Sequence, residues 1–164
     1  MSMDVVAERA GVSKATIYRW WPSKEVLALD ALATEWQVTG SANSRDTGSL
    51  RGDLLARFRP WLRQLRQKPY GRVIAGLVAE AQADPEFAEL YLERFVRPRR
   101  EATRPLLLRA IARGEVPANA DLEVALDLIY GPIYHRLLHG HAPLDDRFAR
   151  SVIETALAGI APER

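Results

Sequence analysis

The chain has 164 residues, 48% of them hydrophobic, which suffices for the core of one or two small domains. It contains no cysteine, which excludes disulfides and thiolate metal sites, and we find no membrane-spanning run or secretory leader. The formal net charge of +2 is too small to indicate nucleic-acid binding by itself. We therefore expect a soluble protein that acts in the cytoplasm.

Residues 2–24, SMDVVAERAGVSKATIYRWWPSK, predict two short helices joined by a glycine turn and followed by the start of a third. Ser2 can cap the first helix. Gly11 lies where the chain must turn sharply, and glycine accepts a positive φ without steric cost. Ser13 can cap the second helix by accepting a hydrogen bond from a free backbone N–H. The pattern predicts a helix-turn-helix.

The second helix is expected to expose polar side chains while Ile17 points inward. Small and hydroxyl side chains at its start allow close approach to base edges in a major groove. Lysine, tyrosine and threonine suit phosphate oxygens. The candidate DNA-contacting residues are Ser13, Lys14, Ala15, Thr16, Tyr18, Arg19, Trp20 and Lys24. We expect residues 14–16 to approach bases and the tyrosine, arginine and later lysine to hold phosphates.

This region resembles the DNA-binding helices of the TetR family of transcriptional repressors. The resemblance is carried by residues 6–7, 10–13, 16–18 and 22–24, in the spacing from AGVS through TIYRWW to PSK. The later segments AIARGEV and IYGPIYHRLL look like the ligand-binding half of such regulators. The resemblance implies a dimeric repressor on a palindromic DNA operator, released by a small apolar or aromatic effector.

The family normally places a further helix of a dozen or more residues before the position of Met3, whereas two residues precede it here. Without that helix, Val6, Ile17 and Leu27 would lose part of their cover, at roughly 1.5–3 kcal/mol for each exposed side chain. We therefore expect the DNA-binding domain, residues 1–39, to be incomplete at its N-terminus and mobile or rearranged. The alternative function is a dimeric ligand-binding or interaction module without effective DNA binding.

The segments that follow have a 3.6-residue hydrophobic period, and none predicts a strand. Ser23 can cap a helix that runs to about residue 38. The polar residues 40–49 predict a loop and a boundary to a second domain, residues 50–164. Pro60 should kink or restart the helix that begins there. The expected fold class is all-α, a helix-turn-helix head followed by a helical bundle for effector binding and dimerisation.

Proline, aspartate and glycine signals predict the remaining helix ends. Helix starts are expected at Pro69, Asp84, Asp121 and Asp145. Helix ends are expected at Gly114, Gly140 and near Gly159, with interruptions at Pro98 and Pro105 and a bend at Gly131–Pro132.

An effector site is expected inside the bundle, because a pocket between helices with few polar groups commonly binds small molecules. The candidate lining residues are Trp61, Leu65, Tyr70, Ile74, Leu77, Phe87, Tyr91, Phe95, Tyr130 and Tyr134. The alternative for each is an ordinary core position. Two arginine-rich stretches, residues 57–72 and 94–104, are interpreted as solvated helix faces, with contact to phosphate or an anionic ligand as the alternative.

The resemblance implies a homodimer in which the last two helices of each subunit pair into a four-helix bundle. The apolar residues expected to contribute are Leu126, Ile129, Ile133, Leu137, Ile153, Leu157 and Ile160. The alternative is that they fill the core of their own subunit.

Three histidines, at positions 135, 139 and 141, lie close together in the sequence. Two of them, four residues apart, could share a metal, but no third ligand is placed, so we favour a role at the helix C-terminus. We predict no metal and no cofactor. The chain lacks a G-x-S-x-G elbow, a P-loop and a dinucleotide fingerprint, and we predict that it is not an enzyme.

Overall fold

The computed structural model describes residues 2–40, 45–67 and 69–160. Part of the predicted loop, residues 41–44, and the end of the second predicted domain, residues 161–164, lie outside this range. The elements are α1 (Met3–Ala10), α2 (Lys14–Trp20), α3 (Lys24–Gly40), α4 (Leu50–Arg66), α5 (Tyr70–Ala83), α6 (Pro85–Tyr91), the π-helix η2 (Leu92–Val96), α7 (Arg97–Ala112), α8 (Leu122–His139) and α9 (Asp146–Ile160). The described residues contain no strand, which confirms the all-α fold class. Within them no helix is both long and apolar enough to cross a bilayer.

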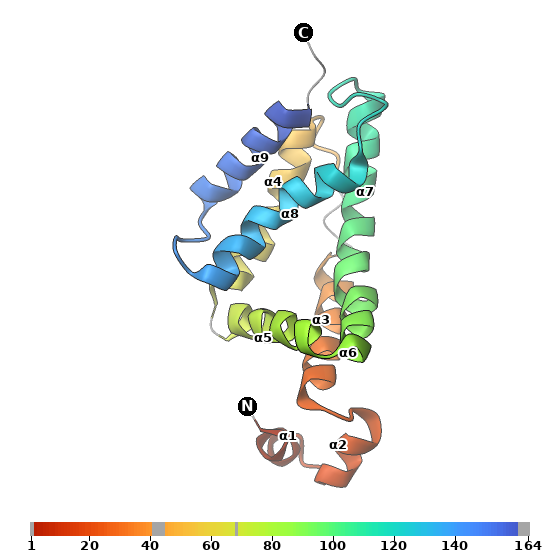
Figure 1. Cartoon of the computed structure of the whole chain (residues 1–164), viewed down its shortest axis with the longest axis vertical. Helices are drawn as coiled ribbons and strands as arrows, with labels where there is room; N and C mark the ends of the chain where they lie inside the picture. The colour runs from red at the N-terminus through yellow and green to blue at the C-terminus, as the bar shows by residue number, and fades with distance from the viewer. Residues whose placement is uncertain (1, 41–44, 68, 161–164) are drawn as a thin grey trace.

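The molecule has a small head and a larger helical body (Figure 1). Helices α1 and α2 form the head at one end, and α3 leads from it into the body. In the body, α5 lies across the end nearest the head, α7 runs along one side, and α9 packs on α4 and α8.

The predicted caps form as the residue types require. The Asp84 carboxylate accepts hydrogen bonds from the backbone N–H groups of Glu86 at 2.9 Å and Phe87 at 3.3 Å. Asp121 caps α8 in the same way, and Asp145 accepts from a backbone N–H of α9 at 2.8 Å. Each carboxylate satisfies N–H groups that a helix start leaves free.

The prolines interrupt the helices less than the sequence predicts. Pro60 lies inside α4, which runs unbroken from Leu50 to Arg66, so the helix does not restart there. Pro105 and Pro132 likewise lie inside α7 and α8. The irregular turn falls in η2, which ends at Val96, shortly before Pro98, and there the helical path from α6 into α7 opens to π geometry. A π-bulge places one extra residue in a helix and occurs frequently at functional sites.

Two separate clusters of buried side chains hold the fold together. The head has a cluster of Met3, Ala7 and Ile17, with Leu27 of α3 packed against it. Leu29, which follows Leu27 closely in α3, already belongs to the main cluster of the body. The two clusters thus divide within α3, and the proposed boundary at the loop after it remains a prediction.

Four of the residues predicted for the dimer interface belong instead to the core of their own subunit. Leu126 and Ile129 are fully buried, and Ile133 and Ile153 are each 2% exposed. They pack in the main cluster because α8 lies against the body and α9 covers α4 and α8. The outward face of α8 carries a different apolar set, Val124, Leu128 and Leu138.

Candidate functional site

The head is a helix-turn-helix fixed by local hydrogen bonds. Gly11 ends α1 in the left-handed region at φ 65°, and the N–H of Val12 reaches back to the carbonyl of Ala7 at 3.1 Å. This geometry is a helix stop that glycine adopts without strain. Ser13 then caps α2, with its hydroxyl 3.1 Å from the N–H of Thr16. The two caps set the angle between the helices.

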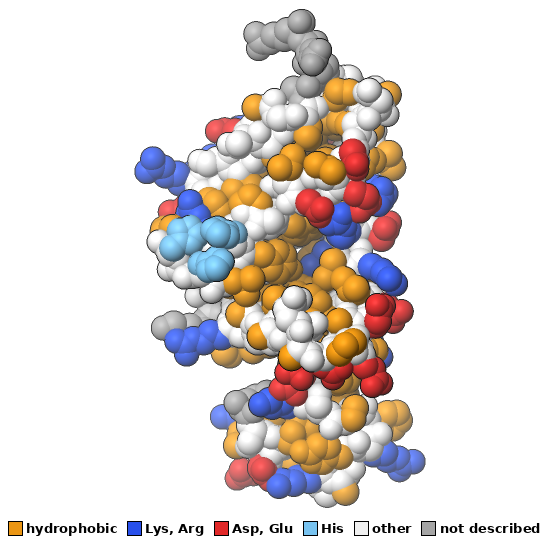
Figure 2. Space-filling view, in the orientation of Figure 1, with side chains coloured by type: hydrophobic (Ala, Val, Ile, Leu, Met, Phe, Trp, Pro, Cys, Tyr) orange, Lys and Arg blue, Asp and Glu red, His pale blue; other side chains and the backbone are white. Residues whose placement is uncertain are grey.

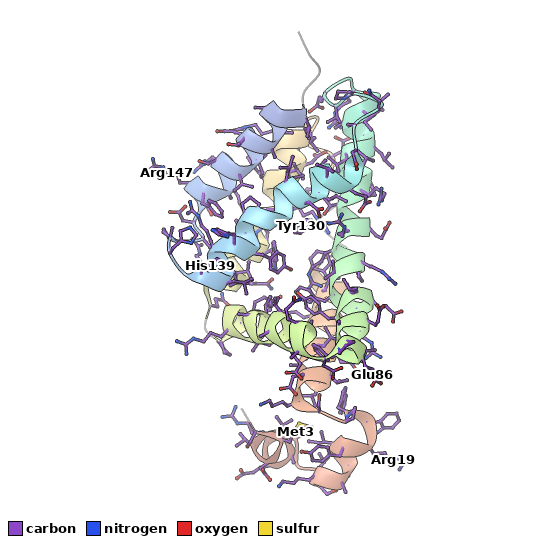
Figure 3. All side chains as sticks on the ribbon, viewed as in Figure 1. Met3, Arg19, Glu86, Tyr130, His139 and Arg147 are labelled. Atoms are coloured by element: carbon purple, nitrogen blue, oxygen red, sulfur yellow. The ribbon has the colours of Figure 1, made fainter. Side chains whose placement is uncertain are left out.

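Helix α2 presents nearly its whole surface to solvent. Ile17 is its only buried residue, and all eight predicted DNA-contacting positions are exposed. Trp20 is 70% exposed, which is unusual for so large an apolar side chain. Lys14 pairs with Asp4, and Arg19 lies on the outer side of the head (Figure 3). The arrangement leaves one helix free to enter a groove.

A polar link joins the end of α2 to the body. The indole N–H of Trp21 donates to a carboxylate oxygen of Asp30, in α3, at 2.9 Å. The other oxygen of Asp30 accepts from the guanidinium of Arg94, which belongs to η2. A groove of about 850 Å³ lies beside this link, between α3 and the η2–α7 segment. Asp30 therefore contacts both Trp21, the residue that follows α2, and Arg94 of the π-helix.

The body holds a cavity of about 260 Å³ between α7 and α8. Its lining residues are Val96, Arg99, Arg100, Asp127, Tyr130, Gly131 and Tyr134. Two predicted effector residues, Tyr130 and Tyr134, are among them, and Tyr130 lies on the inner side of α8 (Figure 3). Trp61 borders a narrower space that shares Arg99 and Tyr130 with the cavity. The cavity matches the predicted location between helices but only part of the predicted lining.

The other predicted lining residues divide into two groups. Tyr91 stacks on Phe95, with ring centroids 5.1 Å apart, and the Arg99 guanidinium lies over the Phe95 ring. These two rings therefore pack against Arg99 and do not line the cavity themselves. Burial raises the pKa of Tyr70, and the nearby Arg99 guanidinium acts to lower it, which places Tyr70 close to Arg99. The remaining four, Leu65, Ile74, Leu77 and Phe87, do not line the cavity and are buried in the main cluster.

Two buried arginines are the main feature that the sequence did not reveal. Arg99 is 2% exposed and Arg57 is 5% exposed, although both were predicted to lie on solvated faces. Both guanidiniums stack on the ring of Trp36, at 4.5 and 5.0 Å from its centroid. The available signal was spacing, since Arg99 follows Phe95 by four residues and so shares its buried helix face.

Hydroxyl groups crowd the backbone next to Arg99. The hydroxyls of Thr103 and Tyr130 lie 2.8 Å apart, and both donate to the carbonyl oxygen of Arg99, at 3.0 and 3.1 Å. Burial lowers the pKa of the Arg99 guanidinium, although the surrounding tyrosine hydroxyls act in the opposite direction. Burial also raises the pKa of Tyr134 well above its usual value, so this phenol stays neutral.

The rim of the cavity is electrostatically different from its interior. Arg100 pairs with the carboxylates of Glu123 and Asp127, and the hydrogen bonds raise its pKa although desolvation acts against them. Arg104 also pairs with Glu123. The rim cations are therefore neutralised by neighbouring carboxylates.

The three histidines gather on one surface patch beside the end of α8 (Figure 2). The ring centroid of His135 lies 4.6 Å from that of His139 and 5.1 Å from that of His141. In the described part of the chain no group of three potential ligands is arranged to hold a metal ion.

An exposed helix that follows a glycine turn, on a helical body, is the arrangement of a helix-turn-helix DNA-binding protein. Residues 1–31 match the family model for bacterial regulatory proteins of the tetR family, and residues 44–156 match the tetracyclin repressor-like C-terminal domain. The chain therefore belongs to the TetR family of transcriptional regulators.

Individual relatives agree with this assignment. The chain is 38% identical to the HTH-type transcriptional regulator YdeS of Bacillus subtilis (strain 168), over 98% of this chain and 79% of YdeS. It is 32% identical to the DNA-binding transcriptional repressor TetR of Mycobacteroides abscessus, over 95% of this chain and 80% of that protein. The crystal structure of the TetR family regulator SCO0332 matches with a TM-score of 0.82 and 35% identity, over 98% of this chain and 87% of that one. Regulators of this family bind DNA operators, act as dimers and are not normally enzymes.

Proposed function

We propose that this protein is a cytoplasmic, dimeric repressor that a small-molecule effector releases from its DNA operator. The observation that carries the proposal is the pairing of an exposed α2 with a cavity in the same chain. The relatives support the DNA-binding part, since one of them is a DNA-binding transcriptional repressor.

In the proposed complex α2 enters the major groove. Residues 14–16 approach base edges, where small and hydroxyl side chains allow close contact. Tyr18, Arg19 and Lys24 hold phosphates and fix the register. All of these side chains are exposed, and Lys14 can exchange its exposed partner Asp4 for DNA.

The link from cavity to head runs through η2. Arg99 touches Phe95, the guanidinium lying 3.5 Å from the ring centroid, and Phe95 is part of η2. Arg94, its neighbour in η2, holds Asp30, which holds Trp21 at the end of α2. An effector that favours one arrangement of η2 would shift the head, and DNA affinity would fall only by the effector's differential affinity for the two states.

The proposed dimer uses the outward faces of α8 and α9. Val124, Leu128 and Leu138 are exposed apolar side chains on α8, and hydrophobic side chains gather over this helix in Figure 2. A twofold dimer would present two α2 helices to half-sites separated by one helical turn or a multiple.

The first experiment is selection of bound duplexes from a random pool at low and moderate salt. We expect enrichment of a palindromic site. Arg19→Ala should weaken binding to all sequences and reduce the salt slope by about one, because one phosphate contact is lost. Arg72→Ala is the matched control, since Arg72 is exposed on α5 in the body. A folded dimer that enriches no site would favour the ligand-binding module without DNA binding.

The link can be tested at Asp30, which lies outside the predicted DNA contacts. Asp30→Asn weakens the hold on Arg94 and should change operator affinity in the absence of effector. Glu154→Gln, on an exposed carboxylate of α9, is the control. Equal operator affinity for Asp30→Asn and the unaltered protein would contradict the route through η2.

A further inference from the structure

We infer that the cavity between α7 and α8 binds a compact carboxylate, whose charged group is taken by the buried guanidinium of Arg99, with the second positive charge of Arg57 nearby. The inference rests on the proposed effector function of this cavity and narrows the effector to an anionic class.

The first argument is uncompensated charge. Both arginines are more than nine-tenths buried, and in each the Nε and one terminal nitrogen have no hydrogen-bond partner in the described structure. Among the described residues neither forms an ion pair with a carboxylate. Arg99 donates from its remaining nitrogen to the carbonyl of Phe95, at 2.8 Å. Arginines are almost never this buried without a partner, and an anion that enters the cavity would accept hydrogen bonds from the unpartnered N–H groups of Arg99.

The second argument is convergence. Both guanidiniums stack on the ring of Trp36, so two cations share one small region. Both also line the narrow space beside Trp61, which meets the cavity at Arg99 and Tyr130. This space has a volume of about 10 Å³ and is too small for a carboxylate, so the anion lies on the cavity side of Arg99. Two nearby cations repel each other in a low dielectric, and an anion held by Arg99 in the cavity offsets that repulsion. The planar guanidinium fork matches the two oxygens of a carboxylate.

The third argument is the contrast with the rim. Arg100 already pairs with two carboxylates, which neutralise its positive charge. The Asp127 carboxylate would repel an anion at the rim, so the charged group belongs at the inner, Arg99 end. The tyrosine rings of α8 are left to hold the apolar body of the ligand. The volume of about 260 Å³ lies below the roughly 300–1,000 Å³ of typical drug-sized sites, which favours a ligand with one or two rings.

The test compares two series of probes on the full chain: benzoate, phenylacetate and 2-naphthoate, and the primary amide of each. Each amide has nearly the shape of its carboxylate but no charge. Binding is followed by calorimetry and by tryptophan fluorescence, since Trp36 and Trp61 border the site. At least one carboxylate should bind about tenfold or more tightly than its amide, the factor expected for hydrogen bonds to a charged group.

The decisive variant is Arg99→Met, which keeps side-chain length and removes the charge. It should raise the Kd of the carboxylate about tenfold and leave that of the amide unchanged. Arg97→Met, an exposed position in the same helix, is the control and should change neither. Arg99→Met should also raise the Tm of the ligand-free protein, because an unpaired buried charge is removed.

Equal binding of amides and carboxylates, or no binding by either series, would overturn the inference. The proposed DNA-binding function would be unaffected, because the selection of bound duplexes tests it separately. A lower Tm for Arg99→Met together with unchanged carboxylate binding would also overturn it. If a carboxylate binds more tightly than its amide but leaves operator affinity unchanged, the anion site is supported and the proposed release of DNA by the effector is contradicted.

Discussion

The head and the body are built from the same kind of helix but are stabilised in different ways. The head buries three side chains, Met3, Ala7 and Ile17, and relies on the Ser2 and Ser13 caps and the Gly11 turn. The body has a continuous core that joins every helix from α3 to α9.

This difference bears on function. A cap contributes about 1 kcal/mol, and few buried contacts mean that a segment can open locally. A recognition helix on such a unit can adjust to DNA, whereas a ligand cavity needs a body that holds its walls in place. The body accepts two buried, unpaired arginines because the surrounding core supplies the stability that they remove.

The sharpest comparison deletes the same atoms from each core. Ile129→Ala in α8 should lower the free energy of unfolding by about 2–5 kcal/mol, because the cavity left in a continuous core cannot collapse. Denaturant unfolding followed by circular dichroism measures it. A loss below about 1 kcal/mol would mean that the body tolerates cavities and that the two regions differ less than their packing indicates.

Ile17→Ala in α2 should act locally. It removes the largest side chain of the head cluster, so residues 3–20 should lose hydrogen-exchange protection while α4, α8 and α9 keep theirs. Operator affinity should fall strongly. Equal loss of protection in head and body would show that the two unfold as one unit.

Asp53 tests whether a buried ion-pair network gives the body a pH dependence that the head lacks. Burial acts to raise the pKa of Asp53, but hydrogen bonds from Thr47 and Arg109 outweigh it and leave the pKa lowered. Because the folded-state pKa lies below the unfolded value of about 3.9, this stabilisation is full above that pH and is lost as the pH falls through the folded-state pKa. Asp53→Asn should lower stability by about 1–3 kcal/mol at pH 7 and flatten the acid dependence below about pH 4. Denaturant titrations at several pH values, with Asp146→Asn as an exposed control, measure both effects; an unchanged acid slope would contradict the prediction.

A pair of glycines allows a smaller, matched test. Gly11 in the head and Gly140 in the body both have positive φ, 65° and 62°, and a Cβ at either would meet no atom within 4 Å. Alanine at each position should therefore cost about 1 kcal/mol from backbone strain alone. We expect Gly140→Ala to lower the global Tm and Gly11→Ala to lower hydrogen-exchange protection in the head only. The same Tm change for both variants would show that the head does not unfold independently of the body.

The smallest effect is expected for an exposed ion pair. Arg51 and Glu154 join α4 and α9 at 2.7 Å, and both side chains are about half exposed. Arg51→Ala should change the free energy of unfolding by less than about 1 kcal/mol, and the change should vanish at high salt. A larger or salt-independent loss would show that packing of the Arg51 stem matters more than its charge.

Local sequence determined the helix caps, although α4 and α7 continue through Pro60 and Pro105, where the sequence predicted interruptions. Ser13, Asp84 and Asp121 cap as their residue types require, and Gly140 stops α8 in the left-handed region, because capping depends on residues within one turn. The helix-turn-helix was predictable for the same reason, and the family resemblance was visible in a short stretch.

Only the tertiary structure decided which charged and apolar side chains are buried. Arg99 enters the core because Trp36 of α3 and Tyr130 of α8 meet it there, and neither is near it in sequence. Helix α8 is apolar around most of its surface, so periodicity could not tell Ile129, which faces the core, from Leu128, which faces solvent. Burial is set by contacts between distant segments, and a one-dimensional pattern records only which faces are able to make them.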